Sequence, residues 1–266
     1  MKPLHALPLL LLLLVSCGGI GQAYSTGPAP EAQIPKLIAH WSFDETSGLA
    51  IDSIGGHQGT VSHVTRGVQG VMGSAYLFDG KTSRVTMADA PSLSQKTWSV
   101  ATWVWVNTKQ NVVLVSKGLF PGYNYKLDAV GDWFGAAVGV NTRQGPEQMI
   151  ARWDDTPYPM KTWNHLVATY DGASLRLYVN GKLRRTTKLT DKGPVLSNQP
   201  LVIGTYVQDN YPVLDGAMDE VMLYAGALSA ADVAHLYDVQ KAGLQDCQNC
   251  EPSLAVMPMV RKQLVR

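Results

Sequence analysis

The adjacent carboxylates Asp154-Asp155 and Asp219-Glu220 are the first residues whose type suggests chemistry. Glycoside hydrolysis uses two carboxylates that face one substrate. Successive residues of a β-strand point to opposite faces, so adjacent carboxylates do not share a substrate. The chain also contains no H-E-x-x-H, G-x-S-x-G or Walker sequence, which are the signatures of zinc, serine and phosphate chemistry. The sequence therefore predicts no catalytic residues and a protein that is not an enzyme.

Aromatic residues beside turn-forming residues are a second set with chemical potential. Sugar rings pack on exposed aromatic faces, while nearby polar groups bind the sugar hydroxyls. Trp133 follows Gly131-Asp132, Trp153 precedes Asp154-Asp155, and several tyrosines lie close to Gly, Pro or Asn. The alternative for each residue is an aromatic ring folded over the end of a sheet. The candidate carbohydrate-binding residues are Tyr123, Trp133, Trp153, Tyr158 and Tyr211.

The N-terminus has the features of a targeting segment. Residues 1–16 combine Lys2 with an apolar run that is too short for a permanent membrane span of about 20 residues, and they predict a signal peptide. Leu14-Val15-Ser16-Cys17 resembles the lipobox of bacterial lipoproteins. The resemblance implies lipidation of Cys17, secretion across the inner membrane and anchoring at the outer membrane or cell surface. Ordinary secretion with cleavage nearby is the alternative.

Cys247 and Cys250 form a C-x-x-C sequence in a polar C-terminal segment. A structural zinc site needs four ligands, and no histidine lies near this pair in the sequence. A thioredoxin-type redox site needs a βαβ context, which the sequence lacks. In an oxidising compartment, the pair therefore predicts a local disulfide.

The charge balance excludes one class of partner. Removing residues 1–16 takes away Lys2 and no acidic residue, which leaves 21 basic and 21 acidic residues. A mature chain without net charge or a basic stripe lacks the electrostatic surface that nucleic acid requires.

The rest of the chain divides into a tether at 17–36, a folded domain at 37–240 and a tail at 241–266. The tether is rich in Gly, Pro, Ser and Ala and buries too little to fold. Short β-branched and aromatic runs, such as 99–106, alternate with turn residues and favour a β-sandwich. Asn180-Gly181 predicts a tight hairpin turn. Ser229 and Asp232 predict the start of one short C-terminal helix.

A set of motif segments follows in order along the predicted domain: Ile38–Gly48, Asp52–Thr60, Ala75–Gly80, Trp98–Val104, Trp163–Gly172, Leu177–Gly181, Ile203-Gly204, Leu214–Val221 and Ala227–Val233. This ordered set resembles the laminin-G-like domains of the concanavalin-A-like lectin/glucanase superfamily. The resemblance implies an all-β fold of two antiparallel sheets, a jelly-roll sandwich with its first and last strands adjacent. This superfamily includes lectins, adhesion modules and polysaccharide-cleaving enzymes, so the fold alone does not define the function.

The same resemblance implies a calcium ion at the edge of the sandwich, as in many relatives. Ca²⁺ prefers several oxygen ligands, including carboxylates and backbone carbonyls. Asp44, Asp79 and Asp219 are the candidate metal ligands. The alternative is that each aspartate caps a turn.

Together these features favour a non-catalytic module that binds carbohydrate at the cell surface or envelope. The first alternative is a protein-interaction or adhesion module that binds a surface protein. A polysaccharide-cleaving enzyme is the second and least favoured alternative. A carbohydrate-binding module is expected to present two or more exposed aromatic rings with polar groups beside them.

Overall fold

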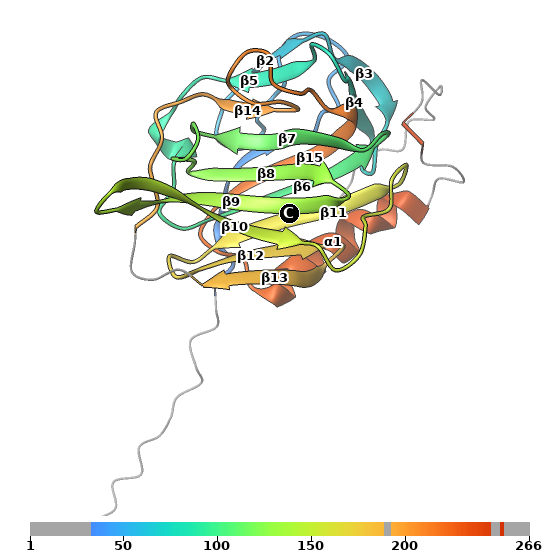
Figure 1. Cartoon of the computed structure of the whole chain (residues 1–266). Coiled ribbons are helices and arrows are strands. Elements are labelled where there is room, and N and C mark those ends of the chain that lie inside the picture. Colours follow the sequence, from blue (N-terminus) through green and yellow to red (C-terminus); the bar gives the residue numbers. More distant parts are fainter. Residues whose placement is uncertain (1–32, 189–192, 246–250, 253–266) are drawn as a thin grey trace, which may run out of the picture. The chain divides into compact units, whose positions relative to one another are not determined.

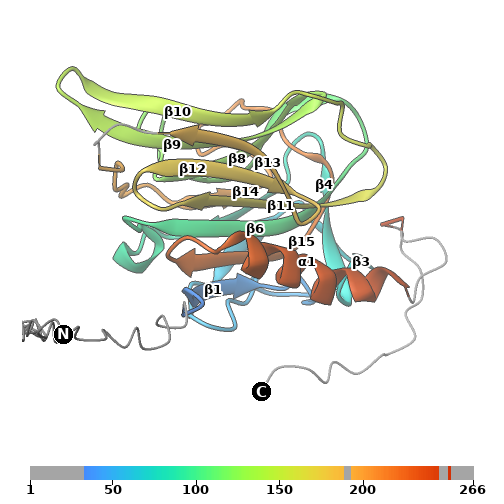
Figure 2. The ribbon, with the colours of Figure 1, turned by 90° about the horizontal axis from the view of Figure 1, so that it is seen from below.

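A computed structural model of the chain describes residues 33–188, 193–245 and 251–252. The chain divides into two units, residues 1–33 and 34–266. The second unit contains two antiparallel sheets and one α-helix (Figures 1 and 2). The predicted all-β sandwich is therefore confirmed. The predicted signal peptide, the lipidated Cys17 and the Cys247–Cys250 disulfide lie outside the described residues and stay predictions.

The eight-stranded sheet has the order β13-β12-β11-β6-β15-β4-β3, and β1 also pairs with β15. The first and last strands of the domain are thus adjacent, as the family resemblance implied. The strands are β1 (Lys36–Trp41), β3 (Thr65–Gln69), β4 (Ser74–Asp79), β6 (Trp98–Val106), β11 (Trp163–Tyr170), β12 (Ser174–Val179), β13 (Lys182–Lys188) and β15 (Asp215–Ala225).

The seven-stranded sheet has the order β10-β9-β8-β7-β14-β5-β2. A short 3₁₀ helix, η1 (Pro91–Leu93), precedes β6. The strands are β2 (Gly59–Ser62), β5 (Arg84–Met87), β7 (Gln110–Lys117), β8 (Tyr125–Gly131), β9 (Trp133–Thr142), β10 (Gly145–Trp153) and β14 (Leu201–Ile203).

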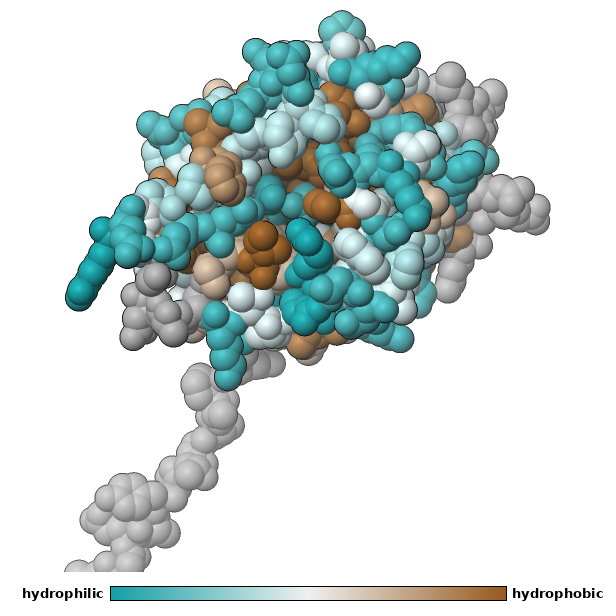
Figure 3. Space-filling model, in the orientation of Figure 1, coloured by the Kyte–Doolittle hydropathy of each residue, from teal (hydrophilic) through white to brown (hydrophobic). Residues whose placement is uncertain are grey.

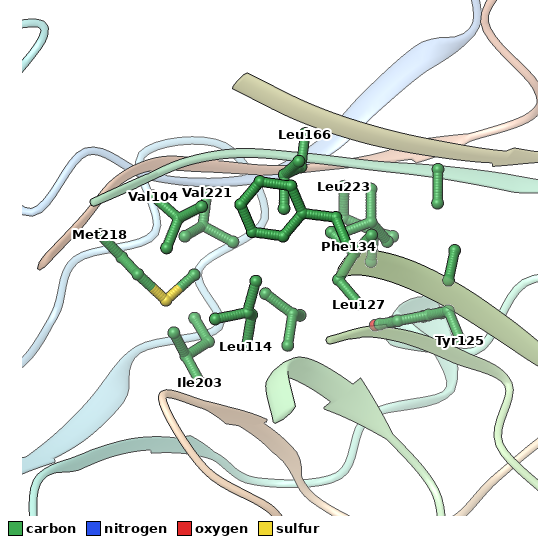
Figure 4. Close-up of a cluster of buried hydrophobic side chains, with 14 of the residues drawn as sticks. Val104, Leu114, Tyr125, Leu127, Phe134, Leu166, Ile203, Met218, Val221 and Leu223 are labelled. Carbon is green, nitrogen blue, oxygen red and sulfur yellow. The ribbon is translucent and has the colours of Figure 1, made fainter. Parts of the chain in front are cut away.

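Apolar side chains from the facing sides of the two sheets form the main core. Alternation along each strand sends Val104, Leu166 and Leu223 inward from one sheet, toward Leu127 and Phe134 from the other (Figure 4). Burial of each such side chain stabilises the fold by about 1.5–3 kcal/mol. This interior holds the two sheets together and fixes which side of each strand faces outward.

The β12–β13 hairpin forms where Asn180-Gly181 predicts it. Asn180 and Gly181 have φ angles of 52° and 74°, which are the left-handed values that a two-residue hairpin turn requires. Val179 consequently pairs with Lys182.

The helix α1 (Ala230–Gln245) begins at the predicted cap. The Asp232 backbone N–H donates to Ser229 Oγ at 3.1 Å, and the Ser229 N–H donates to the Asp232 carboxylate at 2.8 Å. No helix in the described part of the chain is both long and apolar enough to cross a membrane.

α1 packs on the outer face of the eight-stranded sheet (Figure 2). Tyr237 and Leu244 contact the layer formed by Trp103, Trp105 and Trp163. No α-helix of the described residues lies on the corresponding outer face of the seven-stranded sheet (Figure 1). This face is turned to the viewer in Figure 1.

Side chains of β13 join the edges of the two sheets. Arg185 Nε donates to the backbone oxygen of Arg152 at 2.9 Å, and Thr187 Oγ1 donates to that of Ile150 at 2.7 Å. Arg185 also forms an ion pair with Asp154. β10 and β13 are therefore linked although they belong to different sheets.

Candidate functional site

Two of the three predicted calcium ligands converge on one turn. The Ser74 N–H donates to Asp44 Oδ1 at 2.9 Å. The N–H groups of Val71 and Met72 donate to Asp219 Oδ2 at 2.8 and 3.0 Å. Asp44 follows β1 and Asp219 belongs to β15, so both carboxylates hold the turn between β3 and β4.

Asp79 lies at the opposite end of β4, about 17 Å from Ser74 at the usual rise per residue. Burial acts to raise its pKa, but three backbone N–H donors outweigh that effect and hold the pKa of Asp79 well below its ordinary value. These donors belong to Lys81, Thr82 and Ser83, so Asp79 caps a turn. Within the described residues, no group of three or more His, Cys, Asp or Glu side chains could hold a metal ion. A three-aspartate site is thus not assembled, and calcium binding stays a prediction.

The five candidate aromatic residues separate by burial. Trp153 and Tyr158 belong to the sandwich core and are 6% and 3% exposed. Tyr158 stacks on Phe134 with ring centroids 4.1 Å apart, and burial, assisted by Asp132, raises the pKa of Tyr158 to about 12. Sugar stacking needs an exposed ring face, so the prediction of Trp153 and Tyr158 as sugar-binding residues is corrected, and the same correction applies to Tyr123, which is 3% exposed. Trp133, at the start of β9, is partly exposed.

The other two candidates meet on the uncovered face of the seven-stranded sheet. Tyr123 comes from the β7–β8 loop and Tyr211 from the β14–β15 loop. Tyr206 joins them, with ring centroids 5.8 Å from Tyr123 and 4.9 Å from Tyr211. Phe120 lies 6.5 Å from Tyr123. We call Phe120, Tyr123, Tyr206 and Tyr211 the aromatic loop cluster.

The aromatic loop cluster has a buried base and an exposed rim. Tyr123 and Tyr206 are 3% and 1% exposed and pack on Val113 of β7, whereas Phe120 and Tyr211 are 68% and 41% exposed. Burial, with a hydrogen bond to Tyr206, raises the pKa of Tyr123 far above its ordinary value. The phenol therefore stays neutral and holds its place beneath the rim.

Backbone contacts fix the β7–β8 loop against the sheet. A side chain at Gly139 would lie 2.8 Å from the backbone of Pro121, Gly122 and Tyr123, so only glycine permits this approach. The Gly139 N–H donates to the Tyr123 backbone oxygen at 2.7 Å. The Phe120 N–H donates to the Tyr206 hydroxyl at 2.5 Å.

A charged pair lies beside the aromatic loop cluster on β8. Lys126 Nζ lies 2.6 Å from Asp128 Oδ2, with side chains 12% and 9% exposed. The same ammonium group lies 5.1 Å from the centre of the Tyr123 ring. Figure 3 shows apolar patches between polar ones on this face of the molecule. Aromatic rings and hydrogen-bonding groups thus occur together here.

Phe120 was not singled out from the sequence, and Tyr206 is one of the tyrosines near turn-forming residues but was not chosen as a sugar-binding candidate. Phe120 precedes Pro121-Gly122, and Tyr206 follows Gly204-Thr205. Both residues therefore lie next to turn-forming residues, which is the criterion by which Tyr211 was chosen as a candidate. Only the long-range contact between the two loops distinguishes these aromatics from Tyr158, which carries the same signal and is buried.

A second polar arrangement joins three residues that the sequence analysis did not connect. His57 Nδ1 lies 2.7 Å from Asp52 Oδ2, and His57 Nε2 lies 2.7 Å from Ser92 Oγ. This order of groups also occurs in serine hydrolases, which in addition need free N–H donors for the developing oxyanion.

The N–H groups around this arrangement are already in use. Asp52 accepts the backbone N–H groups of His40, Ile54, Gly55 and His57. Those of Leu93 and Ser94 donate to the backbone oxygens of Ala90 and Pro91. Burial acts to raise the pKa of Asp52, but these backbone donors lower it overall. The observed contacts fix the loop at 52–58 against η1.

The fold is a sandwich of two antiparallel sheets with one outer face covered by α1 (Figure 2). The family model for the concanavalin A-like lectin/glucanases superfamily, in its laminin-G form, matches residues 79–234, which is more than half of the chain. The chain therefore belongs to this superfamily. A search of curated protein sequences finds no match.

Solved structures share the fold at low identity. Domain 4 of AbnA, a GH43 extracellular arabinanase from Geobacillus stearothermophilus in complex with arabinotriose, aligns with a TM-score of 0.57 and 21% identity over 77% of this chain and 100% of that domain. The binding domain of Paraclostridial Mosquitocidal Protein 1 gives 0.60 and 15%, covering 76% of this chain and 52% of that domain. The botulinum neurotoxin serotype G binding domain gives 0.59 and 16%, covering 77% and 51%. The chain thus corresponds to about half of each toxin domain.

Proposed function

We propose that the protein is a non-catalytic module that binds carbohydrate at the cell surface, with the aromatic loop cluster as its contact surface. The observation that carries the proposal is the pair of exposed rings, Phe120 and Tyr211, held over a buried base on the sheet face that α1 leaves uncovered. The arabinotriose complex of the related arabinanase domain supports a saccharide ligand for this fold.

The physical case rests on preorganisation. A sugar ring presents C–H groups that pack on an aromatic face, and rings that are already fixed lose little freedom on binding. Tyr206 fixes the Phe120 backbone, and Val113 supports Tyr206 from below. Lys126 and Asp128 supply a donor and an acceptor beside the rings for sugar hydroxyls. We further propose that lipidated Cys17 anchors the module to the membrane.

A glycan array probed with the mature chain tests the proposal. We expect a Phe120→Ala, Tyr211→Ala double variant to lose at least tenfold in affinity, about 1.4 kcal/mol. Its melting temperature should remain close to that of the unmodified protein, because both rings are exposed.

Leu183→Ala is the matched control. Leu183 is apolar and 50% exposed but lies on β13, outside the cluster, so its loss should leave glycan binding unchanged. The absence of binding to every glycan would contradict the proposal. Capture of a surface protein through Phe120 and Tyr211 would instead favour the adhesion alternative.

A further inference from the structure

A hollow of about 560 Å³ lies between the β12–β13 turn and α1. Its lining includes Gly181, Lys182 and Arg184 from the hairpin and Tyr237 and Lys241 from the helix. None of these residues belongs to the aromatic loop cluster. The volume falls within the range of about 300–1,000 Å³ that is usual for sites of small ligands.

The hollow is lined by more positive than negative charge. Lys182, Arg184 and Lys241 are cationic, and Asp238 is the carboxylate in the lining. Asp238 lies 3.6 Å from Lys241 Nζ, and its side chain is 69% exposed, so this ion pair neutralises little. Lys182 and Arg184 form no ion pair within the part of the chain that the structure describes.

Arg184 is oriented before any ligand arrives. Its guanidinium carbon lies 4.5 Å from the centre of the Trp153 ring, and Trp153 is fixed in the core. Stacking holds one face of the guanidinium and leaves its edge N–H groups in the plane available for a carboxylate or sulfate. Arg184 Nε is buried and has no hydrogen-bond partner among the described residues. A ligand in the hollow would therefore meet the terminal Nη groups of Arg184 and not the buried Nε.

Tyr237 forms a rigid wall of the hollow. A Cβ atom at Gly181 would lie 2.9 Å from the Tyr237 ring, so the turn and the helix are in close contact. The same ring packs against Trp103 and His165, with centroids 5.6 and 5.9 Å away. Burial lowers the pKa of His165 to about 3, so this histidine stays neutral near pH 7. The positive charge around the hollow therefore comes from the lysine and arginine side chains.

We propose that this hollow binds a carboxylate or sulfate group carried by a sugar ring. Arg184 donates paired hydrogen bonds to the anionic group through its terminal N–H groups. Lys182 and Lys241, whose ammonium group lies 5.0 Å from the centre of the Tyr237 ring, add charge. The inference rests on the proposed function in taking the ligand to be a saccharide, and it adds a second set of residues that selects acidic glycans.

Isothermal titration of the mature chain with three saccharides tests this inference: tri-galacturonic acid, its neutral counterpart galactotriose, and a sulfated galactose disaccharide. We expect tighter binding of one or both acidic saccharides. Comparison of tri-galacturonic acid with the sulfated disaccharide shows whether the hollow binds a carboxylate or a sulfate group. Arg184→Gln and Lys182→Gln should each weaken acidic binding at least tenfold and leave galactotriose binding unchanged.

Lys188→Gln is the matched control, because Lys188 lies on the same strand and its loss changes the net charge equally. The inference is overturned if Arg184→Gln weakens acidic binding no more than Lys188→Gln does, or if acidic and neutral saccharides bind equally. Galactotriose binding that depends on Phe120 and Tyr211 would leave the proposed function intact in either case. Melting temperatures of all variants establish that each remains folded.

Discussion

The Asp52 carboxylate stabilises the fold, although the order Asp52, His57 and Ser92 resembles that of a serine hydrolase. Its side chain is fully buried in contact with His57, and four backbone N–H groups converge on its oxygens. Ser92, at the other end of the arrangement, is exposed. We therefore assign the stabilising role to Asp52 and little to Ser92.

Asp52→Asn should lower the free energy of unfolding by about 2–3 kcal/mol, because hydrogen bonds to a charged acceptor are among the strongest in proteins. The pKa of Asp52 is lower in the folded state. Its contribution is consequently present above the unfolded pKa of about 4 and declines as the pH falls through the folded pKa. Urea unfolding at pH 7 and below pH 4 measures both effects.

Ser92→Ala is the control and should change the stability by less than about 0.5 kcal/mol. Labelling of Ser92 by a fluorophosphonate probe, lost in His57→Gln, would show a reactive nucleophile instead and contradict the structural assignment.

At the scale of elements, local signals predicted the hairpin and the helix well. Asn180-Gly181 and the Ser229–Asp232 cap depend on residues close in sequence, so one sequence suffices to locate them. Burial of aromatics depends on distant partners instead. Trp153 and Tyr158 have polar and turn-forming neighbours in sequence, yet β10 and the following loop turn both rings inward. The aromatic loop cluster forms where two loops about 80 residues apart in sequence come into contact. The pattern of apolar residues along the sequence does not predict such a contact.

Gly181→Ala should destabilise the β12–β13 turn and its contact with α1. The left-handed φ of 74° disfavours alanine, and the new Cβ would lie 2.9 Å from the Tyr237 ring. We expect a loss of about 1–3 kcal/mol, measured by thermal or urea unfolding. Gly193→Ala, where a Cβ meets no atom within 4 Å, should be nearly neutral. Equal effects of the two changes would contradict this account of the turn.

At the scale of the whole molecule, the pairing of β1 with β15 brings the start and end of the domain together. The loop after β1 and β15 itself each send a carboxylate, Asp44 and Asp219, to the turn between β3 and β4. Family resemblance predicted an ion at the sandwich edge, and we propose these two residues as its remaining candidate ligands. An ion there would strengthen the closure of the sandwich.

Calcium is therefore expected to raise the melting temperature, and a chelator to lower it. A hundredfold excess of Ca²⁺ over its Kd stabilises a folded protein by about 2.7 kcal/mol. The calcium response should survive in Asp79→Asn, because Asp79 lies at the far end of β4. A melting temperature that does not change with calcium or chelator would rule out the site.

The link between β10 and β13 has a consequence for how copies of the protein behave in concentrated solution. An exposed edge strand offers its backbone to a strand from another molecule and so begins polymerisation. In β10, two of the carbonyl oxygens that would receive such a strand already accept bonds from Arg185 and Thr187. The side chains that close the sandwich thus also hinder pairing of the β10 edge with a strand from another copy.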